Sequence, residues 1–556
     1  MPVSENGYQI KLLSSLEKVF PDAEPACCKM PDLTMLRGET LSFQAAVKGP
    51  SPGRETVEVR VISPIRDAVR VRSVELVPSA YPCHPRHDEN YLRTVPGMFP
   101  DLLRELDGGA FNLIAGQWRA VWIDVEAKAD TPAGIWPVEI SLVKSGEVLC
   151  RAAAKVEIFS PVLPEQTLRH TEWFYADCLA DYYHTEVFSE AHWRLIENFM
   201  RAAVRRGVNM FLTPCFTPPL DTEEGGERTT VQLVGVDVKN GEYSFHFDRL
   251  HRWIDLMRKC GGKYIEIAHL FTQWGAHAAP KVMATVNGEY KRIFGWDTPA
   301  VGGSYTEFLK RFLPQLTKFL REQGVSERTY FHISDEPSEE NIDSYLAAKS
   351  SVQKELENFK VIDALSSYEF YRRGIAENPV CSSDHIEPFL EHGVPHLWTY
   401  YCTAQCVGVS NRFMSQPSAR NRILGIQLYK YGIDGFLHWG YNFYNSMASE
   451  SHINPYAVTD AGGAYPSGDP FLVYPGPGGV PEESIRMMVL FDGLQDLRAL
   501  RLLEQYVGHE KVVAMLEENL AEPITFSSYP ADAGYLLNIR NRINREIMSC
   551  ELHCHP

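Results

Sequence analysis

A unit of helix, glycine and short apolar run recurs along the chain from about residue 167. Ser189 opens one predicted helix, which Gly207 ends before the apolar run 208–212. The same order returns at 248–270, 304–333 and 418–439. Ser and Asp accept hydrogen bonds from the free N–H groups of a first turn, and Gly adopts the left-handed conformation that ends a helix. The repeated order predicts alternating helices and parallel strands.

About eight strands are predicted in this part of the chain. They lie at 170–176, 208–213, 263–270, 328–335, 359–365, 379–383, 395–401 and 434–440. Eight such units over about 330 residues fit a TIM-like (β/α)8 barrel of the α/β class, with insertions, better than the alternative of an open, doubly wound sheet. No GxGxxG or GxxxxGK[ST] pattern opens a helix, so the best signatures of nucleotide binding are missing.

Residues 1–162 follow a different pattern, with short alternating runs between Gly and Pro turns. Examples are 41–47, 57–62, 74–77, 119–125 and 138–142. Period-two alternation is typical of an antiparallel β-sandwich, and the first helical pattern comes only at 101–106. At 556 residues the chain is about twice as long as one core usually supports. We therefore expect an N-terminal β-sandwich domain at 1–162, a barrel at 167–505 and a C-terminal helical extension at 506–556.

The charge of the chain limits its partners. The formal charge is −17 and no basic stripe interrupts it, so neither nucleic acids nor membranes are expected partners. The N-terminal segment lacks the basic start and apolar core of a signal peptide, and no apolar run is long enough to span a bilayer. The chain as given is therefore expected in the cytoplasm, although a signal removed beforehand would leave the same pattern. The oligomeric state does not follow from the sequence.

Twelve cysteines are too few for a disulfide scaffold, and most lie within apolar segments, which favours reduced thiols. Three clusters contain metal-ligand residue types: Cys83, His84, His87 and Asp88; Cys402 and Cys406; and Cys550, His553, Cys554 and His555. None has paired ligands at zinc-site spacing, so structural roles are preferred. The sequence therefore predicts no metal site.

Polar and aromatic residues gather at the carboxyl ends of the predicted strands, where barrel enzymes hold their reacting groups. The fourth strand ends in Asp335 and Glu336, and Pro337 stops it because proline cannot donate to the ladder. The candidate substrate contacts are Glu172, Trp173, Tyr175, Trp274, His332, Trp398, Tyr400, Trp439, Tyr441 and Asn442. Single aromatic residues at such places often only pack, but several converging rings can stack on the C–H face of a sugar. We therefore predict a carbohydrate site, which Asp469 and Tyr474 could also reach.

The adjacency of Asp335 and Glu336 favours one mechanism, provided that both groups act. Two carboxyls that straddle a scissile bond stand about 5–5.5 Å apart in retaining glycosidases and about 6.5–9.5 Å apart in inverting ones. Neighbours on one strand end suit instead a route in which the 2-acetamido oxygen of the sugar attacks the anomeric carbon. Glu336 would be the general acid and base, and Asp335 would orient the acetamido group and stabilise the oxazolinium intermediate. A protein nucleophile such as Glu266, Asp363 or Asp384 is the alternative, and neither route needs a cofactor.

At these residues the sequence resembles glycoside hydrolase family 123, the β-N-acetylgalactosaminidases with an N-terminal β-sandwich and a C-terminal barrel. The matching segments are LRGETLSFQAAV (36–47), HISDEP (332–337), GFLHWGYNFY (435–444), GDPFLVYPG (468–476) and SIRMMVLFDGLQD (484–496). The catalytic Asp–Glu pair of the family carries over to Asp335 and Glu336. The resemblance implies a retaining, exo-acting enzyme that removes terminal β-linked N-acetylgalactosamine (GalNAc) from glycans. The preference for GalNAc over N-acetylglucosamine (GlcNAc) is implied by the resemblance alone.

Two alternatives stay open. A non-catalytic glycan-binding protein on the same scaffold would bind sugar without turnover, and the intact Asp335–Glu336 pair makes it the weaker hypothesis. A glycosidase of another β-hexosaminide, or of a sugar without the acetamido group, is the other alternative. A glycosidase of a sugar without the acetamido group would need a separate nucleophile.

Overall fold

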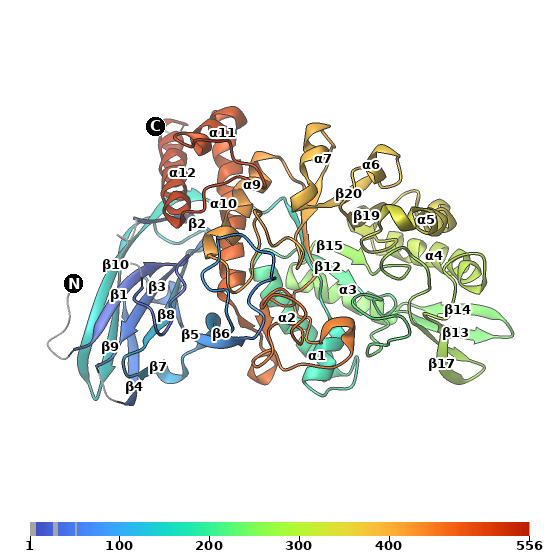
Figure 1. Cartoon of the computed structure of the whole chain (residues 1–556), viewed down its shortest axis with the longest axis horizontal. Helices are drawn as coiled ribbons and strands as arrows, with labels where there is room; N and C mark the ends of the chain where they lie inside the picture. Colours follow the sequence, from blue (N-terminus) through green and yellow to red (C-terminus); the bar gives the residue numbers. More distant parts are fainter. Residues whose placement is uncertain (1–6, 26–31, 51–52, 555–556) are drawn as a thin grey trace.

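The computed structural model describes residues 7–25, 32–50 and 53–554, and its N-terminal part forms two five-stranded sheets (Figure 1). The strands are β1 (Gln9–Ser14), β2 (Leu33–Arg37), β3 (Thr40–Lys48), β4 (Arg54–Ile62), β5 (Val69–Ser79), β6 (Gly97–Glu105), β7 (Ala110–Ile114), β8 (Trp118–Glu126), β9 (Gly134–Lys144) and β10 (Glu147–Val162). One sheet has the order β1-β3-β8-β5-β6 and the other β2-β10-β9-β4-β7. Inward side chains of both, such as Phe43, Val121 and Ile140, share one buried core. The predicted sandwich is confirmed.

Two details of the sandwich differ from the prediction. Residues 101–106 were expected to begin a helix, but most of them belong to β6, which pairs antiparallel with β5. Phe99, Leu102 and Leu103 are buried there, so packing overrides the local helical pattern. In addition, β2 pairs with β10 in parallel, whereas the other strand pairs of the two sheets are antiparallel.

Eight parallel strands close into a barrel in the second part of the chain. They are β11 (Arg169–Glu172), β12 (Met210–Thr213), β15 (Tyr264–Ile267), β18 (Thr329–Phe331), β19 (Lys360–Leu365), β20 (Asn378–Ser382), β21 (Trp398–Tyr400) and β22 (Gly435–His438). They follow one another around the barrel in sequence order, and β22 pairs with β11 to close it. The TIM-like barrel is therefore confirmed, with one strand at each of the eight predicted places. Most strands end earlier than predicted, and the fourth ends at Phe331 instead of continuing to Asp335.

The predicted helices begin at or next to their expected opening residues. The helices from Ala176 to Val507 are α1 (Ala176–Tyr182), α2 (Glu190–Arg205), α3 (Asp248–Cys260), α4 (Ser304–Glu322), α5 (Ile342–Leu356), α6 (Glu369–Arg372), α7 (Glu387–Glu391), α8 (Ser418–Arg422), α9 (Leu424–Lys430) and α10 (Ile485–Val507). Of the expected opening residues only Ser189 makes a side-chain cap bond, whereas Asp248, Ser304 and Ser418 are themselves the first residues of α3, α4 and α8. The side chain of Ser189 accepts a hydrogen bond from the backbone N–H of His192 and caps α2. Gly261 takes a φ of 97° at the end of α3, in the left-handed region that glycine adopts at least cost.

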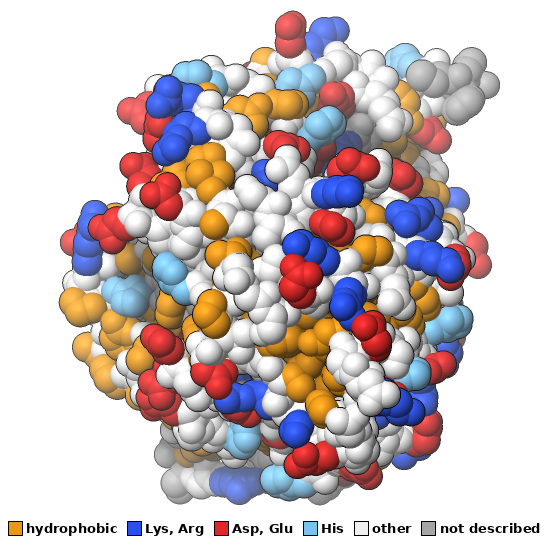
Figure 2. All heavy atoms as spheres, turned by 90° about the vertical axis from the view of Figure 1, so that its right-hand side faces the viewer, with side chains coloured by type: hydrophobic (Ala, Val, Ile, Leu, Met, Phe, Trp, Pro, Cys, Tyr) orange, Lys and Arg blue, Asp and Glu red, His pale blue; other side chains and the backbone are white. Residues whose placement is uncertain are grey.

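An unpredicted four-stranded sheet grows out of the loops after β12 and β15. Its strands are β13 (Gly235–Lys239), β14 (Glu242–His246), β16 (Val282–Val286) and β17 (Glu289–Phe294). It projects from the side of the barrel away from the sandwich (Figure 1). Acidic and basic side chains are interspersed over this side of the molecule, and no basic stripe crosses it (Figure 2).

Two further helices, α11 (His509–Glu517) and α12 (Ala533–Cys554), complete the chain. Helix α12 packs against α10 and also against β2 and β10, so it joins the barrel to the sandwich (Figure 1). Within this seam the Arg540 guanidinium contacts both Glu39 and Asp496. Among the described residues, no helix is both long and apolar enough to cross a bilayer.

Candidate active site

A cavity of about 200 Å³ opens among the residues that follow the barrel strands. Its lining consists of Trp173, Tyr175, Leu220, Asp221, Gln273, Trp274, Asp335, Glu336, Ala364, Tyr400, Cys402, Thr403, Leu437, Trp439 and Tyr465. These residues come from most of the strand ends around the barrel. The cavity thus occupies the place where enzymes of this fold carry out their chemistry.

Asp335 and Glu336 lie side by side in this lining, just after β18, and neighbouring loops fix their positions. The Tyr400 hydroxyl donates a hydrogen bond to Glu336 Oε1 at 2.7 Å. The backbone N–H of Trp274 donates to the backbone oxygen of Asp335 at 2.9 Å. Glu336 has a φ of 43°, in the left-handed region that costs a non-glycine residue about 1–3 kcal/mol. Surrounding contacts therefore hold the pair in a strained geometry.

The electrostatics of the pair favour one shared proton. Burial, followed by the negative charge of Glu336, raises the pKa of Asp335 well above its usual range. Burial also raises the pKa of Glu336, while the hydrogen bond from Tyr400 opposes this rise. Two adjacent carboxyls in a poorly solvated site cannot both ionise at low cost. Near neutral pH the pair can therefore supply both a proton donor and a negative charge.

A buried polar layer lies directly below the pair. His332 Nε2 lies 2.7 Å from Glu266 Oε1, and His332 Nδ1 lies 3.4 Å from Asp363 Oδ1. Burial lowers the pKa of His332, but the nearby Asp363 carboxylate and the hydrogen bond to Glu266 outweigh it and raise that pKa to about 9. The resulting imidazolium lowers the pKa of Asp335 and so favours its ionised form. His332 thus supports the cavity from below and does not line it.

The three alternative nucleophiles are engaged elsewhere. Glu266 accepts hydrogen bonds from Thr171 and from Trp173 Nε1, the latter at 2.8 Å. Asp363 accepts from the Tyr345 hydroxyl at 2.5 Å, and Asp384 accepts from Gln405 at 3.0 Å. None of the three carboxylates lines the cavity. Their geometry gives no support to a protein nucleophile.

The structure places some predicted substrate contacts in the cavity and others outside it. Trp173, Tyr175, Trp274, Tyr400 and Trp439 line the cavity, whereas Glu172, His332, Trp398, Tyr441 and Asn442 do not.

Those outside the cavity pack or bond within the barrel. Glu172 pairs with Arg412 at 2.7 Å, and the Tyr441 hydroxyl donates to the backbone of Phe199 at 3.0 Å. Asn442 bonds both the N–H and the carbonyl of Tyr175.

Trp398 is the first residue of β21 and fills the space beside Gly435, where a Cβ would lie 1.9 Å from its indole. All five are buried and engaged in other contacts, so in this structure they support the residues that line the cavity.

Residues that the strand-end rule missed also face the cavity. Asp221 and Tyr465 come from long loops, and the Tyr465 hydroxyl donates to Asp221 Oδ1 at 2.8 Å. Of the two further candidates, Asp469 accepts from Trp439 Nε1 at 2.9 Å and so fixes a lining ring. Tyr474 bonds Asp101 at 2.6 Å and does not line the cavity. Loop residues without periodic pattern gave no signal by which Asp221 could be found.

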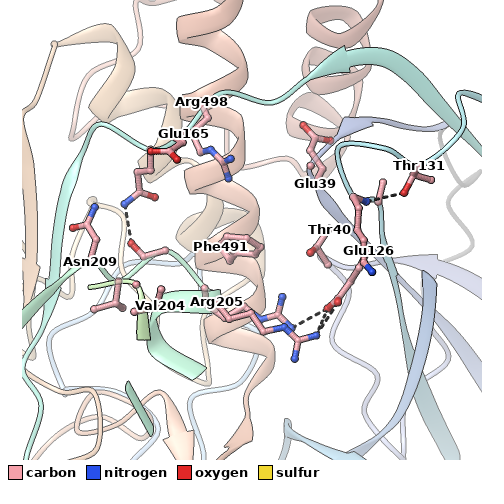
Figure 3. A pocket seen from close by; sticks show the side chains of 18 of the residues that line it. Glu39, Thr40, Glu126, Thr131, Glu165, Val204, Arg205, Asn209, Phe491 and Arg498 are labelled. Atoms are coloured by element: carbon pink, nitrogen blue, oxygen red, sulfur yellow. Dashed lines mark hydrogen bonds and ion pairs between the residues drawn. The ribbon is translucent and has the colours of Figure 1, made fainter. Parts of the chain in front are cut away.

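A larger cavity, of about 610 Å³, lies between the sandwich and the barrel (Figure 3). Asn209 and Lys263, which line it, precede β12 and β15, so it lies at the amino ends of the strands. Three of its four acidic side chains are paired with cations: Glu39 contacts Arg540, Glu126 pairs with Arg205 at 2.6 Å, and Glu165 pairs with Lys263 at 2.8 Å. The smaller cavity, with its unneutralised pair, is therefore the candidate active site.

The cysteine and histidine clusters do not form metal sites in the described part of the chain, where no group of three or more His, Cys, Asp or Glu residues could hold an ion. Asp88 pairs with Arg420 at 2.8 Å, and His84 bonds the backbone of Thr403 at 2.9 Å. Cys402 lines the cavity, whereas Cys406 does not. The C-terminal cluster lies partly outside the described residues.

Comparison with known proteins identifies the family. The model of the glycoside hydrolase 123 catalytic domain matches residues 173–503. A family 123 glycoside hydrolase from Clostridium perfringens, whose structure addressed the hydrolysis of glycolipid glycans, superposes with a TM-score of 0.73. It is 15% identical, and the match covers 98% of each chain. A GH5 xyloglucanase from Bacteroides ovatus reaches a TM-score of only 0.28 at 10% identity, over 84% of this chain and 98% of its own.

No curated protein matches the sequence. The structural likeness to the Clostridium perfringens protein extends over both the sandwich and the barrel, and at this identity it shows the fold. The family model covers more than half of the chain and includes Asp335, Glu336 and the lining residues from Trp173 to Tyr465. The chain therefore belongs to glycoside hydrolase family 123 and is a glycoside hydrolase.

Proposed function

We propose that this enzyme is a retaining, exo-acting β-N-acetylgalactosaminidase that uses the acetamido group of its substrate as the nucleophile. The observation that carries the proposal is the position of Asp335 and Glu336, adjacent in sequence and facing one cavity. The third carboxylate of the lining, Asp221, is already engaged by the Tyr465 hydroxyl. Adjacent carboxyls suit a substrate-assisted route better than a nucleophile and an acid on opposite sides of a sugar.

In the first step Glu336 donates its proton to the glycosidic oxygen as the bond from that oxygen to the anomeric carbon breaks. The carbonyl oxygen of the acetamido group attacks the anomeric carbon from the other face and forms the oxazolinium intermediate. Asp335 accepts the acetamido N–H and stabilises the positive charge. In the second step Glu336 takes a proton from water, and the water oxygen bonds to the anomeric carbon. The bond from the acetamido oxygen to that carbon breaks, so the oxazolinium ring opens and the acetamido group is restored. Two inversions give net retention.

The shared proton fits this sequence of steps. The Tyr400 hydroxyl favours an ionised Glu336, because it donates to that carboxylate. An acetamido N–H donated to Asp335 would favour the ionised form of Asp335 instead. Substrate binding would therefore leave the proton on Glu336, whose raised pKa suits a general acid at neutral pH.

The shape of the cavity supports exo-action on one terminal sugar. A volume of about 200 Å³ is small for a binding site, so it suits a single sugar residue better than a long chain. Trp439 offers an aromatic face. Its position is fixed by the hydrogen bond from its Nε1 to Asp469 and by an edge-to-face contact with the Tyr465 ring, whose centroid lies 5.4 Å from that of the indole. We propose terminal β-GalNAc as that sugar because the family resemblance implies it. A glycan that ends in β-GalNAc is the proposed substrate.

Hydrolysis of the p-nitrophenyl β-glycosides of GalNAc, GlcNAc and galactose tests the proposal. We expect the wild type to cleave the GalNAc glycoside with retention, measured by NMR of the first-formed anomer. Asp335→Asn and Glu336→Gln should each lower kcat by about 10²–10⁴-fold. Comparable cleavage of the galactoside, which lacks the acetamido group, would sink the mechanism. Activity that survives in both variants would sink the assignment of the pair.

A further inference from the structure

Trp274 exposes a large indole at the edge of the cavity. Its side chain lines the cavity, yet 55% of the residue remains exposed to solvent. Leaving an apolar ring of this size in water forgoes the free energy that its burial would provide. A single exposed ring needs no explanation on an ordinary surface. This one, however, is bonded through its backbone to the catalytic pair.

The backbone that carries the ring is tightly held. Trp274 has a φ of 56°, and its N–H donates to the backbone oxygen of Asp335 at 2.9 Å. Asn341 Nδ2 donates to the carbonyl of Trp274 at 3.1 Å, and Ser344 Oγ donates to the carbonyl of Gly275 at 2.6 Å. A Cβ on Gly275 would lie 2.8 Å from Asn341 Cβ, so the loop also depends on a glycine there. The backbone that carries the exposed ring is thus fixed beside Asp335.

Exposure limits which part of a substrate can cover the indole. A sugar enclosed in the cavity lies among buried rings such as those of Trp173 and Tyr175, whereas more than half of Trp274 stays in contact with solvent outside that enclosure. The leaving group, in contrast, must extend out of the cavity from the oxygen that Glu336 protonates. We propose that Trp274 is the platform for the first sugar ring of the leaving group, which stacks its C–H face on the indole. This inference rests on the proposed function.

The inference predicts a leaving-group effect that matched substrates can isolate. The substrates are the methyl β-glycoside of GalNAc, the octyl β-glycoside and a disaccharide in which GalNAc is β-linked to galactose. All three release an alcohol, so the chemical step is similar and only the contact outside the cavity differs. We expect Trp274→Ala to lower kcat/KM about tenfold on the disaccharide, but less than about twofold on the methyl and octyl glycosides. Trp274→Phe should restore most of the loss.

Tyr290→Ala is the matched control. Tyr290 is also an exposed aromatic residue, at 63%, but it lies on β17 and outside the cavity. It should change none of the three rates. Thermal unfolding of each variant shows whether the fold is kept.

Each outcome decides the inference. An equal loss on all three substrates in Trp274→Ala would mean that the loop acts on Asp335 and not on the leaving group. A loss on the octyl glycoside as large as on the disaccharide would mean that the platform takes any apolar group. No loss on any substrate would remove the platform altogether. If the wild type cleaves none of the three, the proposed function itself fails, and this inference fails with it.

Discussion

The two ends of the barrel carry cavities of opposite character. The cavity at the carboxyl ends is small, at about 200 Å³, and contains two adjacent carboxyls that share no cationic partner within it. The cavity between barrel and sandwich is about three times larger. Of its acidic side chains, Glu126 is paired with Arg205 (Figure 3), and Glu165 is paired with Lys263. The larger volume thus lies at the end of the barrel where enzymes of this fold do not hold their reacting groups. Buried carboxyls without a cationic partner, held by strained backbone, indicate an active site better than cavity volume does.

The difference also concerns stability. Positive φ values at Asp221, Trp274 and Glu336 destabilise the carboxyl end, as do the buried acids there. At the other end, Glu483 is buried between Arg72 of the sandwich and Arg206 of the barrel. We therefore expect substitutions at the two ends to have different effects. Those at the carboxyl end should mainly change activity, and those at the interdomain contacts should mainly change stability.

The largest expected effect is that of Glu336→Gln. Activity should fall by about 10²–10⁴-fold because the general acid is lost. Stability should not fall with it. An acid with a raised pKa in the folded state contributes stability at low pH and loses that contribution as the pH rises. The neutral amide avoids this loss, so at about pH 8 the variant should unfold at the same temperature as wild type or a higher one. A lower Tm together with the lost activity would contradict the separation.

Glu483→Gln should show the reverse pattern. Removing one partner of a buried ion pair leaves uncompensated charge, which costs about 3–5 kcal/mol. Arg206 bonds Glu483 at 2.6 Å, and Arg72 contacts the same carboxylate. We expect a marked drop in the urea midpoint, while kcat per folded molecule stays unchanged.

Glu482→Gln is the control for this prediction, because its partner Arg104 is half-exposed and the pair should contribute much less. Equal losses in the two variants, or a changed kcat in Glu483→Gln, would show that the interdomain contacts do not act as proposed.

Tyr400→Phe should move the pH profile by a smaller amount. The Tyr400 hydroxyl stabilises ionised Glu336 and so lowers the pKa of that carboxyl. Without this bond the pKa should rise, and the alkaline limb of kcat/KM should move up by about one to two units, since a hydrogen bond to a charged group contributes about 1.5–3 kcal/mol.

Tyr401→Phe is a close control, because the Tyr401 hydroxyl is buried without a hydrogen-bond partner among the described residues. Its profile should match wild type. A downward shift in Tyr400→Phe would contradict the role of Glu336 as an acid.

The sequence predicted the fold and the position of the carboxyl pair for the same reason. Short apolar runs bounded by helix caps and glycines mark barrel strands, and Asp335 and Glu336 follow β18 in the loop after Phe331. The same rule selected Trp398, Tyr441 and Asn442, which do not line the cavity, because a strand-end pattern does not show which way a side chain turns. Trp398 begins its strand instead of ending it.

Other features could not be predicted because they depend on contacts between distant segments. Asp221 meets Tyr465 across 244 positions of the chain, from two loops without periodic pattern. The sheet of β13, β14, β16 and β17 joins segments from two separate loops, and its short strands alternate too briefly to be recognised.

The smallest expected effect is that of Arg205→Ala at the larger cavity. Arg205 and Glu126 are partly exposed, so their ion pair should contribute about 0–1 kcal/mol, and Arg206 remains 3.5 Å from Glu126. We expect less than a twofold change in kcat/KM and a slight fall in Tm. Arg201→Ala is the matched control, because Arg201 forms a similarly exposed pair with Glu197 on the same helix, outside the cavity. If Arg205→Ala lowered activity and Arg201→Ala did not, the amino end of the barrel would take part in function, and the contrast between the two cavities would no longer hold.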